Sequence, residues 1–552
     1  MRSVPARAAL LGALFAALVT LPALGWGTLW DNSETAYGEV AREIVLTHDW
    51  VVMHLNLQPW FVQPPLYFWI AALFAKVFGV SALALRLPSA LATIAMGAAV
   101  GYATARIAGG RAGAVAAVVL STSLMQAIVG RLAIMDALLD FAVAAAILWW
   151  FRALQPAGSS RRRATAFIGG ALALAIGTLA KGPVAPVIVL LVVAVWAAWE
   201  WRSGRIAAPS RGAIALAALA YVVVTLPWFV LLAVRVGPHA ILELIGHYTV
   251  GRYTGVIENQ SGPIWYYVPV LILGFFPWIA FLPAAVRAAW YEGRQRDGAF
   301  ARLALVWALV SFVFFSFANT KLPNYVALLI PALAILVALW FERVAAGAER
   351  GAAIISAASI PVFLGCVAIA ITAFARTNQL SVDAAAVGAQ LAFLGGGMLV
   401  GSLVTVVTIA RRATVAWSPF VLALTSGALV LFIAIVAEPD AERLKPIPPI
   451  ARAIDAHVQP SDLIAMRGTS GNNGLIFYTR PPALDIPDGD DAFKRAVCSA
   501  PRVWVVVQPD DADRLQRDVR AVHRVAAVVA RGPLGTTPPR ALLLRVTGPR
   551  CP

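Results

Sequence analysis

Charged residues are scarce in this chain. Only 13% of its 552 residues are Asp, Glu, Lys or Arg, whereas 60% are hydrophobic, and the mean hydropathy is +0.78. A soluble protein needs far more charge to cover its surface. The composition therefore excludes an ordinary soluble protein and predicts a chain that lies mostly in lipid.

Cysteine is also rare, with residues only at 366, 498 and 551, and none of them forms a CxxC or a Cys/His metal spacing. The sequence requires no cofactor, although it is compatible with a divalent metal. Cys366 lies in an apolar run. Cys498 and Cys551 lie in a polar C-terminal region, and we predict a disulfide between them if that region faces an oxidising compartment.

The net charge of +16 suggests nucleic-acid binding at first sight, but the arrangement of the Arg residues argues against a nucleic-acid partner. Most of them lie in short loops between apolar runs of about 20 residues, the length that spans a bilayer core. Every second loop is rich in Arg, which is the pattern of cytoplasmic loops. The sequence thus predicts a membrane protein with a cytoplasmic N-terminus.

The apolar runs predict a polytopic α-helical membrane protein with about 13 transmembrane helices. The expected spans are near residues 7–25, 86–105, 110–129, 133–152, 165–180, 183–201, 211–235, 266–289, 300–318, 323–342, 351–375, 388–410 and 416–437. The first resembles a signal peptide, but its length favours a retained helix. An odd number of spans places the C-terminus outside.

Two regions interrupt this pattern and define the predicted domains. Residues 1–437 form a transmembrane domain whose long external loop, 26–85, carries interfacial helices near 34–47 and 64–79. Residues 438–552 have ordinary soluble composition and predict a small α/β periplasmic domain. Its strands are expected at 463–466, 475–478, 503–507 and 541–546, and its helices at 447–457, 490–497 and 510–521.

The first candidate site residues are Asp31 and Glu34, which flank a helix start in the external loop. An ionisable group at a membrane boundary is costly unless it is paired or functional. A carboxylate here could act as a general base. The alternative is helix capping, with Ser33 as N-cap and the acids in the first turn.

A second candidate is Asp136, at the external start of the fourth predicted helix, with Asp140 one turn deeper. Asp136 is interpreted as catalytic, the alternative being a partner for the helix dipole. Because a carboxylate inside lipid needs a partner, we expect Asp140 to pair with a cation such as Arg131.

Cations on the same face form the third group. His247 and Arg252 lie among aromatic residues, and Lys321 lies in a tight external turn, as does Lys181. Arg offers a forked, permanent donor for a phosphate. The alternative for the region 247–253 is an interfacial aromatic belt with a snorkelling Arg.

The order of these motifs resembles the ArnT-like branch of the protein-mannosyltransferase superfamily, the C-type membrane glycosyltransferases. The resemblance covers about residues 8–440 and rests on 33–43, 49–50, 64–69, Arg131 with Asp136, and 181–183. It continues through 226–228, His247 with Arg252, 265–267, 277–278, and 321–323 with Tyr325. The family commonly has a glycine where this chain has His48.

The resemblance implies an enzyme of the bacterial inner membrane that uses a polyprenyl (undecaprenyl) phosphate-sugar donor and a lipid or glycan acceptor, as in lipid A modification. An acid of the first loop would activate the acceptor. Ser33 stands where the family has the first acid of an Asp-Glu pair, which leaves Glu34 or Asp31 as the base. Gln63 stands where the lipid A enzymes have Lys.

That replacement shifts phosphate binding to Arg252, His247, Lys321 and Tyr325, with Tyr37 from the first-loop motif also at the donor. Two other functions remain open from the sequence. A transporter or lipid flippase usually shows internal repeats and broken helices, and we find neither here. A non-catalytic membrane scaffold, binding partners through 438–552, is the third reading.

Overall fold

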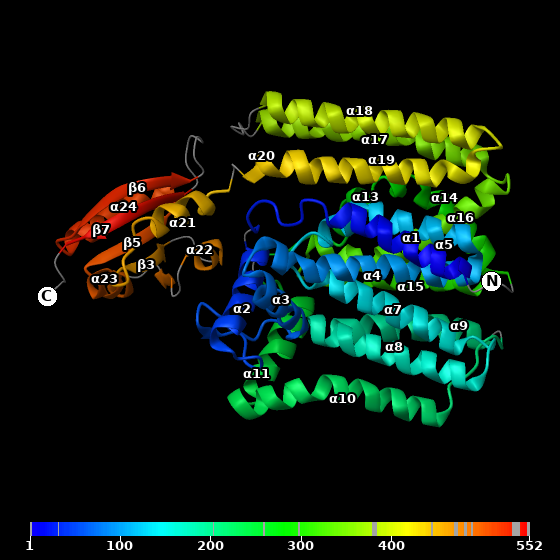
Figure 1. Ribbon diagram of the computed structural model, residues 1–552, viewed down its shortest axis with the longest axis horizontal. Helices are drawn as coiled ribbons and strands as arrows, with labels where there is room; N and C mark the ends of the chain where they lie inside the picture. The colour runs from blue at the N-terminus through cyan, green and yellow to red at the C-terminus, as the bar shows by residue number, and fades with distance from the viewer. Residues whose placement is uncertain are drawn as a thin grey trace.

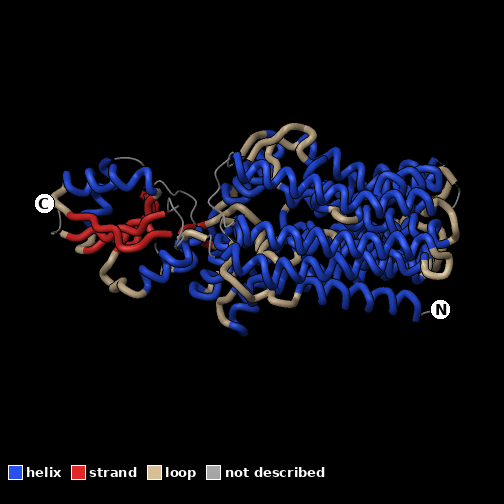
Figure 2. Tube along the Cα trace, turned by 90° about the horizontal axis from the view of Figure 1, so that it is seen from above, coloured by secondary structure: helices blue, strands red, loops and turns tan. Residues whose placement is uncertain are grey.

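The computed structural model describes residues 3–30, 32–202, 204–257, 260–295, 298–377, 384–442, 445–467, 473–479, 483–486, 490–532 and 541–548. A long bundle of helices makes up most of the molecule, and a small sheet flanked by helices lies at one end of it (Figures 1 and 2). The N-terminal helix begins at the opposite end of the bundle (Figure 1).

Among the described residues, eleven helices are long and apolar enough to cross a membrane, or twelve if one bent pair counts as a single span. The spans are built on α1 (Ser3–Thr20), α4 (Ala82–Ala108), α7 (Asp136–Leu154), α8 (Ser160–Lys181), α9 (Val184–Arg202), α10 (Arg211–Val236), α15 (Ala299–Phe317), α16 (Ile330–Ala345), α17 (Arg350–Thr377), α18 (Ala384–Ala410) and α19 (Ser418–Phe432). The predicted polytopic helical class is confirmed.

The exact count of 13 is not matched, because two predicted spans are not straight helices. The run 110–129 divides at Ser123 into α5 (Gly110–Thr122) and α6 (Leu124–Val129). The run 266–289 divides into α13 (Tyr267–Gly274) and a second helix that ends with α14 (Leu282–Gly293), bent by 108°. Hydropathy reports composition and cannot show such breaks.

The first external segment, residues 26–85, takes its name from the predicted external loop and contains the two short helices expected there. They are α2 (Ser33–Thr47) and α3 (Leu66–Phe78), with a hairpin of β1 (His54–Leu55) and β2 (Gln58–Pro59) between them. His48 ends α2 in the left-handed conformation, with φ of 58°, and its N–H donates to the Ile44 carbonyl. Glycine is favoured in that conformation, so the histidine occupies a position that suits a glycine.

The C-terminal sheet is mixed, with strand order β4-β3-β5-β7-β6. Its strands are β3 (Leu463–Arg467), β4 (Ala483–Ile486), β5 (Arg502–Val507), β6 (Val525–Gly532) and β7 (Ala541–Thr547). The β4, β3 and β5 strands run parallel, whereas β7 is antiparallel to both β5 and β6.

Helices cover both faces of this sheet, which is why β5 is apolar along most of its length. Val503, Val505 and Val507 pack on α23 (Asp490–Ser499) and α24 (Pro509–Ala521). Trp504 and Val506 face α21 (Ile447–Asp455) and α22 (Asn473–Tyr478). The alternation of side chains along one strand thus builds two separate cores.

The predictions for this region were right for three of four strands and for all three helices. The run 475–478 is wrong, because it lies in α22, and β4 and β6 were missed. A four-residue apolar run fits a strand or a buried helical turn equally well, and Leu475 and Ile476 are buried from a helix here. Cys498 forms a disulfide and Cys366 is a free thiol. Cys551 lies outside the described residues.

Candidate functional site

A cavity of about 710 Å³ lies between the first external segment and the adjoining ends of several bundle helices. Part of its polar lining comes from α2, the start of α7, the end of α8, and the short 3₁₀ helix η3 (Pro323–Leu329). Its other walls are apolar and include Met125, Val129, Leu139 and Phe314. Such a mixture of apolar walls and a few converging polar groups is typical of a ligand site.

Asp136 and Lys181 form an ion pair in this cavity. The Lys181 Nζ lies 2.5 Å from Asp136 Oδ1, and the Asn324 amide donates to the same oxygen at 2.6 Å. The Lys181 ammonium also lies 5.3 Å from the centre of the Tyr325 ring. Three segments that are distant in sequence thus place a carboxylate, an ammonium, an amide and a phenol at one point.

The second carboxylate oxygen of Asp136, Oδ2, differs from Oδ1 in its hydrogen bonding. Within the described part of the chain it accepts no hydrogen bond, although Asp136 is only 5% exposed and lines the cavity. Lys181 and Asn324 therefore fix the carboxylate through one oxygen and leave the other available to a bound molecule.

Arg252 also lines the cavity, at the end of the wide π-helical segment η1 (Glu243–Gly251). The following loop is held to the turn before η3 by backbone bonds. Thr320 N donates to the Arg252 carbonyl at 3.0 Å, and Asn319 N donates to the Tyr253 carbonyl at 2.9 Å. The sequence predicted that these two loops contribute cations, and the structure brings the loops together.

The first external segment also contributes Ser33, Tyr37 and Gln63 to the polar lining. Tyr37 packs edge-on against Trp60 and Phe68, with ring centres 6.2 and 5.8 Å apart. Of the three positions at which the chain departs from the family motif, Ser33 and Gln63 therefore line the cavity, whereas His48 does not.

Glu34 lines the cavity but is already saturated with hydrogen bonds. Its Oε1 accepts from Arg86 Nε at 3.0 Å and from the Ala133 N–H, while its Oε2 accepts from Arg86 Nη2 at 2.9 Å and from Trp30 N at 2.8 Å. A carboxylate offers about four acceptor sites, so no site remains to take a proton from a substrate. This geometry favours a structural role for Glu34 over the role of general base.

The expectation that Ser33 is the N-cap of this helix is wrong. Asn32, and not Ser33, is the N-cap of α2, and its side chain makes no capping bond. Asp31 lies outside the described residues.

Lys321 and His247 do not line the cavity. Lys321 is 5% exposed, and its ammonium donates to the carbonyls of Ser316 at 2.7 Å and of Ala318, at the C-terminal end of α15. That is the position in which a cation stabilises a helix end, and burial lowers the pKa of this ammonium. His247 is exposed on η1, with its ring 4.8 Å from that of Tyr248.

The expected pair of Asp140 with Arg131 is wrong. The Arg131 guanidinium donates to the carbonyls of Val19, Thr20 and Pro22, at 3.2, 2.9 and 2.9 Å. Asp140 Oδ2 is buried, and among the described residues it has no hydrogen-bond partner. Arg131 thus ties the end of α1 to the bundle, because backbone carbonyls at a helix end attract a cation.

Sequence reasoning noticed Lys181 but did not place it in the site. The signal was a lysine in an external turn, against the charge bias of the other external loops. Asn324 gave no signal of its own beyond lying in the motif 319–325. Among the described residues, no group of three His, Cys, Asp or Glu side chains is suitably placed to hold a metal ion.

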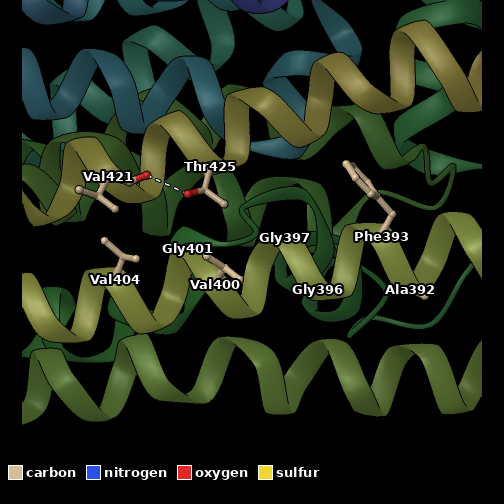
Figure 3. Close-up of a pocket in the computed structure, with 9 residues that line it drawn as sticks. All are labelled: Ala392, Phe393, Gly396, Gly397, Val400, Gly401, Val404, Val421 and Thr425. Atoms are coloured by element: carbon tan, nitrogen blue, oxygen red, sulfur yellow. Dashed lines mark hydrogen bonds between the residues drawn. The ribbon is translucent and has the colours of Figure 1, made fainter.

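A second pocket, of about 480 Å³, lies between α18 and α19 (Figure 3). Glycines, aliphatic side chains, Phe393 and Thr425 line it, and the hydroxyl of Thr425 donates back to the Val421 carbonyl at 3.0 Å. Nothing in this lining can act on a polar substrate, so the first cavity is the candidate site.

Comparison with known proteins shows which families and folds the chain is similar to. Residues 62–228 match the family described as dolichyl-phosphate-mannose-protein mannosyltransferase, and that segment contains Gln63, Asp136 and Lys181. The crystal structure of ArnT from Cupriavidus metallidurans bound to undecaprenyl phosphate has the same fold, with a TM-score of 0.79 and 23% identity over 97% of both chains. Similarity to the mannosyltransferase family thus covers residues 62–228, and the likeness to the ArnT structure shows the fold of the chain.

Curated proteins that are similar to this chain are named undecaprenyl phosphate-alpha-4-amino-4-deoxy-L-arabinose arabinosyl transferase. The one from Edwardsiella ictaluri is 31% identical over 319 residues, and the one from Pseudomonas aeruginosa is 32% identical over 314. These matches cover 57% and 56% of this chain, and 56% and 55% of the relatives' own lengths. The chain thus spans little more than half the length of the curated relatives it matches.

A more distant structure shares the general fold. The oligosaccharyltransferase of Archaeoglobus fulgidus, tethered with an acceptor peptide, aligns with a TM-score of 0.52 and 11% identity over 93% of this chain and 70% of its own.

Proposed function

We propose that the protein is a glycosyltransferase that moves a sugar from a polyprenyl (undecaprenyl) phosphate carrier to a lipid or glycan acceptor at the external membrane face. The observation that carries this proposal is the Asp136–Lys181 pair, set with Arg252 in a largely apolar cavity. The names of the bacterial relatives support it, as does the match to the mannosyltransferase family.

The cations suit a phosphate leaving group. A polyprenyl phosphate-sugar carries one negative charge, and the phosphate gains a second when the bond between the sugar and the phosphate breaks. Lys181 and Arg252 both line the cavity, and fixed cations stabilise charge that develops during a reaction. Tyr37 and Tyr325 provide hydroxyl groups at the same cavity. The apolar walls suit the isoprenoid units next to the phosphate.

Asp136 is the proposed proton acceptor. Its Oδ2 takes the proton from an acceptor hydroxyl, whose oxygen forms the new bond to the anomeric carbon of the sugar. The bond between that carbon and the phosphate oxygen breaks, and its electron pair leaves with the polyprenyl phosphate. Lys181 holds the carboxylate in place through Oδ1 until the phosphate competes for the ammonium. A positioned base contributes roughly 10²–10⁴-fold in rate.

Glu34 serves in this proposal as a scaffold that joins Arg86, Trp30 and Ala133. The roles assigned to Asp31, His247 and Lys321 from the sequence remain predictions, and the geometry favours Lys181 over Lys321 as the phosphate ligand.

The proposed location is the bacterial inner membrane, as a multi-pass protein. Residues 1–437 form the transmembrane domain and residues 438–552 the periplasmic domain. The Arg-rich alternate loops support this orientation, and contacts between the first external segment and the C-terminal region support a common side for both.

The test is transfer by the purified protein in nanodiscs, with labelled polyprenyl phosphate-sugars and lipid A or glycan acceptors. We expect Asp136→Asn to lower kcat by roughly 10²-fold or more. Glu342→Gln is the control, because Glu342 pairs with Arg111 and does not line the cavity. Activity of Asp136→Asn equal to the wild type would remove Asp136 from the mechanism. Failure of the wild type with every donor would refute the proposal.

A further inference from the structure

Trp30 lies where the C-terminal region meets the cavity. It lines the cavity from the chain just before α2. The ammonium of Lys445, from the segment before α21, lies only 4.1 Å from the centre of the Trp30 ring. A cation this close to an indole face is strongly attracted to it, so a residue of the C-terminal region fixes part of the cavity wall.

Lys445 also holds the backbone on which Trp30 sits. Its Nζ donates to the Thr28 carbonyl at 2.8 Å and to the Thr28 hydroxyl at 3.2 Å, and it pairs with Glu442 Oε2 at 2.8 Å. Glu442 in turn accepts the Thr28 N–H at 3.1 Å. With a side-chain exposure of 9%, Lys445 is too deeply buried and too fully bonded to be an incidental surface contact.

A second part of the C-terminal region, the end of α22, forms separate hydrogen bonds with the first external segment. The Tyr478 hydroxyl accepts the N–H of Leu29. From α2, the Arg42 guanidinium donates to the carbonyls of Ile476 and Phe477, both at 3.0 Å, at the end of α22. Leu29 and Trp30 are therefore bonded from the C-terminal region on one side, and Trp30 N donates to Glu34 on the other.

We propose that Trp30 is a substrate-contacting residue that packs against the sugar ring of the donor, and that Lys445 and Tyr478 are positioning residues that hold it there. The C-terminal region thus completes the sugar site. This inference rests on the proposed function. An indole offers a broad, rigid apolar face that needs little ordering on binding. Such a contact works only when its support is fixed within a fraction of an ångström.

The experiment compares Lys445→Met, Lys445→Arg and Trp30→Ala in donor kinetics. Lys445→Met and Trp30→Ala should each raise the donor KM roughly tenfold, the scale of a desolvated cation–π contact, with kcat nearly unchanged. Lys445→Arg keeps the cation and should restore most of the affinity. Lys76→Met is the matched control, since Lys76 lies 5.3 Å from the Trp50 ring and outside the cavity lining.

Two further measurements keep the inference separate from the proposed function. The Trp30→Ala/Lys445→Met double variant should have the KM of Trp30→Ala alone, whereas additive losses would overturn the coupling. Hydrogen exchange at the amides of residues 28–34 should speed up in Lys445→Met and stay unchanged in Lys76→Met, whichever donor proves correct. If neither KM nor exchange responds to Lys445→Met while Lys181→Met abolishes transfer, the positioning role is wrong and the proposed function stands.

Discussion

Lys181 and Asp136 meet in the cavity through an ion pair of 2.5 Å, although 45 residues separate them in the chain. The lysine ends α8 and the aspartate begins α7, so the antiparallel packing of these two helices brings the two residues together. Lys181, which the sequence placed in an external turn without a role, becomes the cation best placed to meet a phosphate.

The two external lysines should behave differently when each is replaced by methionine. Lys181→Met removes a cavity cation and should weaken donor binding by roughly ten- to a hundredfold, the scale of a lost charged hydrogen bond. Lys321→Met removes the cation that holds the last carbonyls of α15 and should lower thermal stability while donor affinity stays near the wild type. Donor affinity and melting temperature in nanodiscs separate the two effects, and the opposite pattern would restore Lys321 as the phosphate ligand.

Glu34→Gln should act mainly on stability. The change removes the nearer of two carboxylates from the buried Arg86 guanidinium, leaving Glu438 at 3.8 Å, and disturbs the bonds to Trp30 and Ala133. Breaking a buried pair in this way costs on the order of 3–5 kcal/mol. The melting temperature in detergent should fall well below that of the wild type. A variant that melts like the wild type but transfers no sugar would show instead that Glu34 is the base, as the family motif implies.

Glu39 should make stability depend on pH. Burial raises the pKa of the Glu39 carboxyl from 4.5 to about 8, against the opposing effect of Arg42 and with help from Glu43. A raised pKa in the folded state means that the folded form holds its proton more tightly than the unfolded form does. The stabilisation is complete below pH 4.5 and is lost as the pH rises through about 8.

The measurement is the melting temperature between pH 5 and 9 for the wild type and Glu39→Gln. We expect the wild type to lose stability steadily across this range, whereas the neutral glutamine should give a flatter profile and the higher melting temperature at pH 9. Parallel profiles would show that Glu39 does not titrate between the two states.

Cysteine labelling tests the proposed orientation. In a Cys366→Ala background, Val80→Cys in the first external segment and Ser499→Cys in the C-terminal region should both react with a reagent that cannot cross membranes, because both positions are exposed. Ser160→Cys, beside Arg161 in a predicted cytoplasmic loop, should react only after permeabilisation. If Ser160→Cys were the one variant labelled in intact cells, the protein would have the opposite orientation in the membrane.

The sequence by itself determined the class of the protein and the approximate position of its helices, because the cost of placing polar groups in lipid is visible in composition alone. It also predicted that the loops around 252 and 321 and the start of α7 contribute polar groups, since rare charges outside the cytoplasmic loops stand out. The sequence did not show whether each predicted span is a straight helix. The breaks at Ser123 and between Gly274 and Trp278 therefore appear only in the folded chain.

The tertiary structure decided which charged residues are available to a substrate. Glu34 and Asp136 look alike in sequence, as acids at helix starts, but Arg86 and two backbone N–H groups saturate Glu34, while Asp136 keeps one oxygen open. Lys181 and Lys321 look alike as lone lysines in turns, yet one faces the cavity and the other caps α15. These acids and lysines differ in the partners that distant segments supply, and the spacing of residues in the sequence does not show which segments pack together.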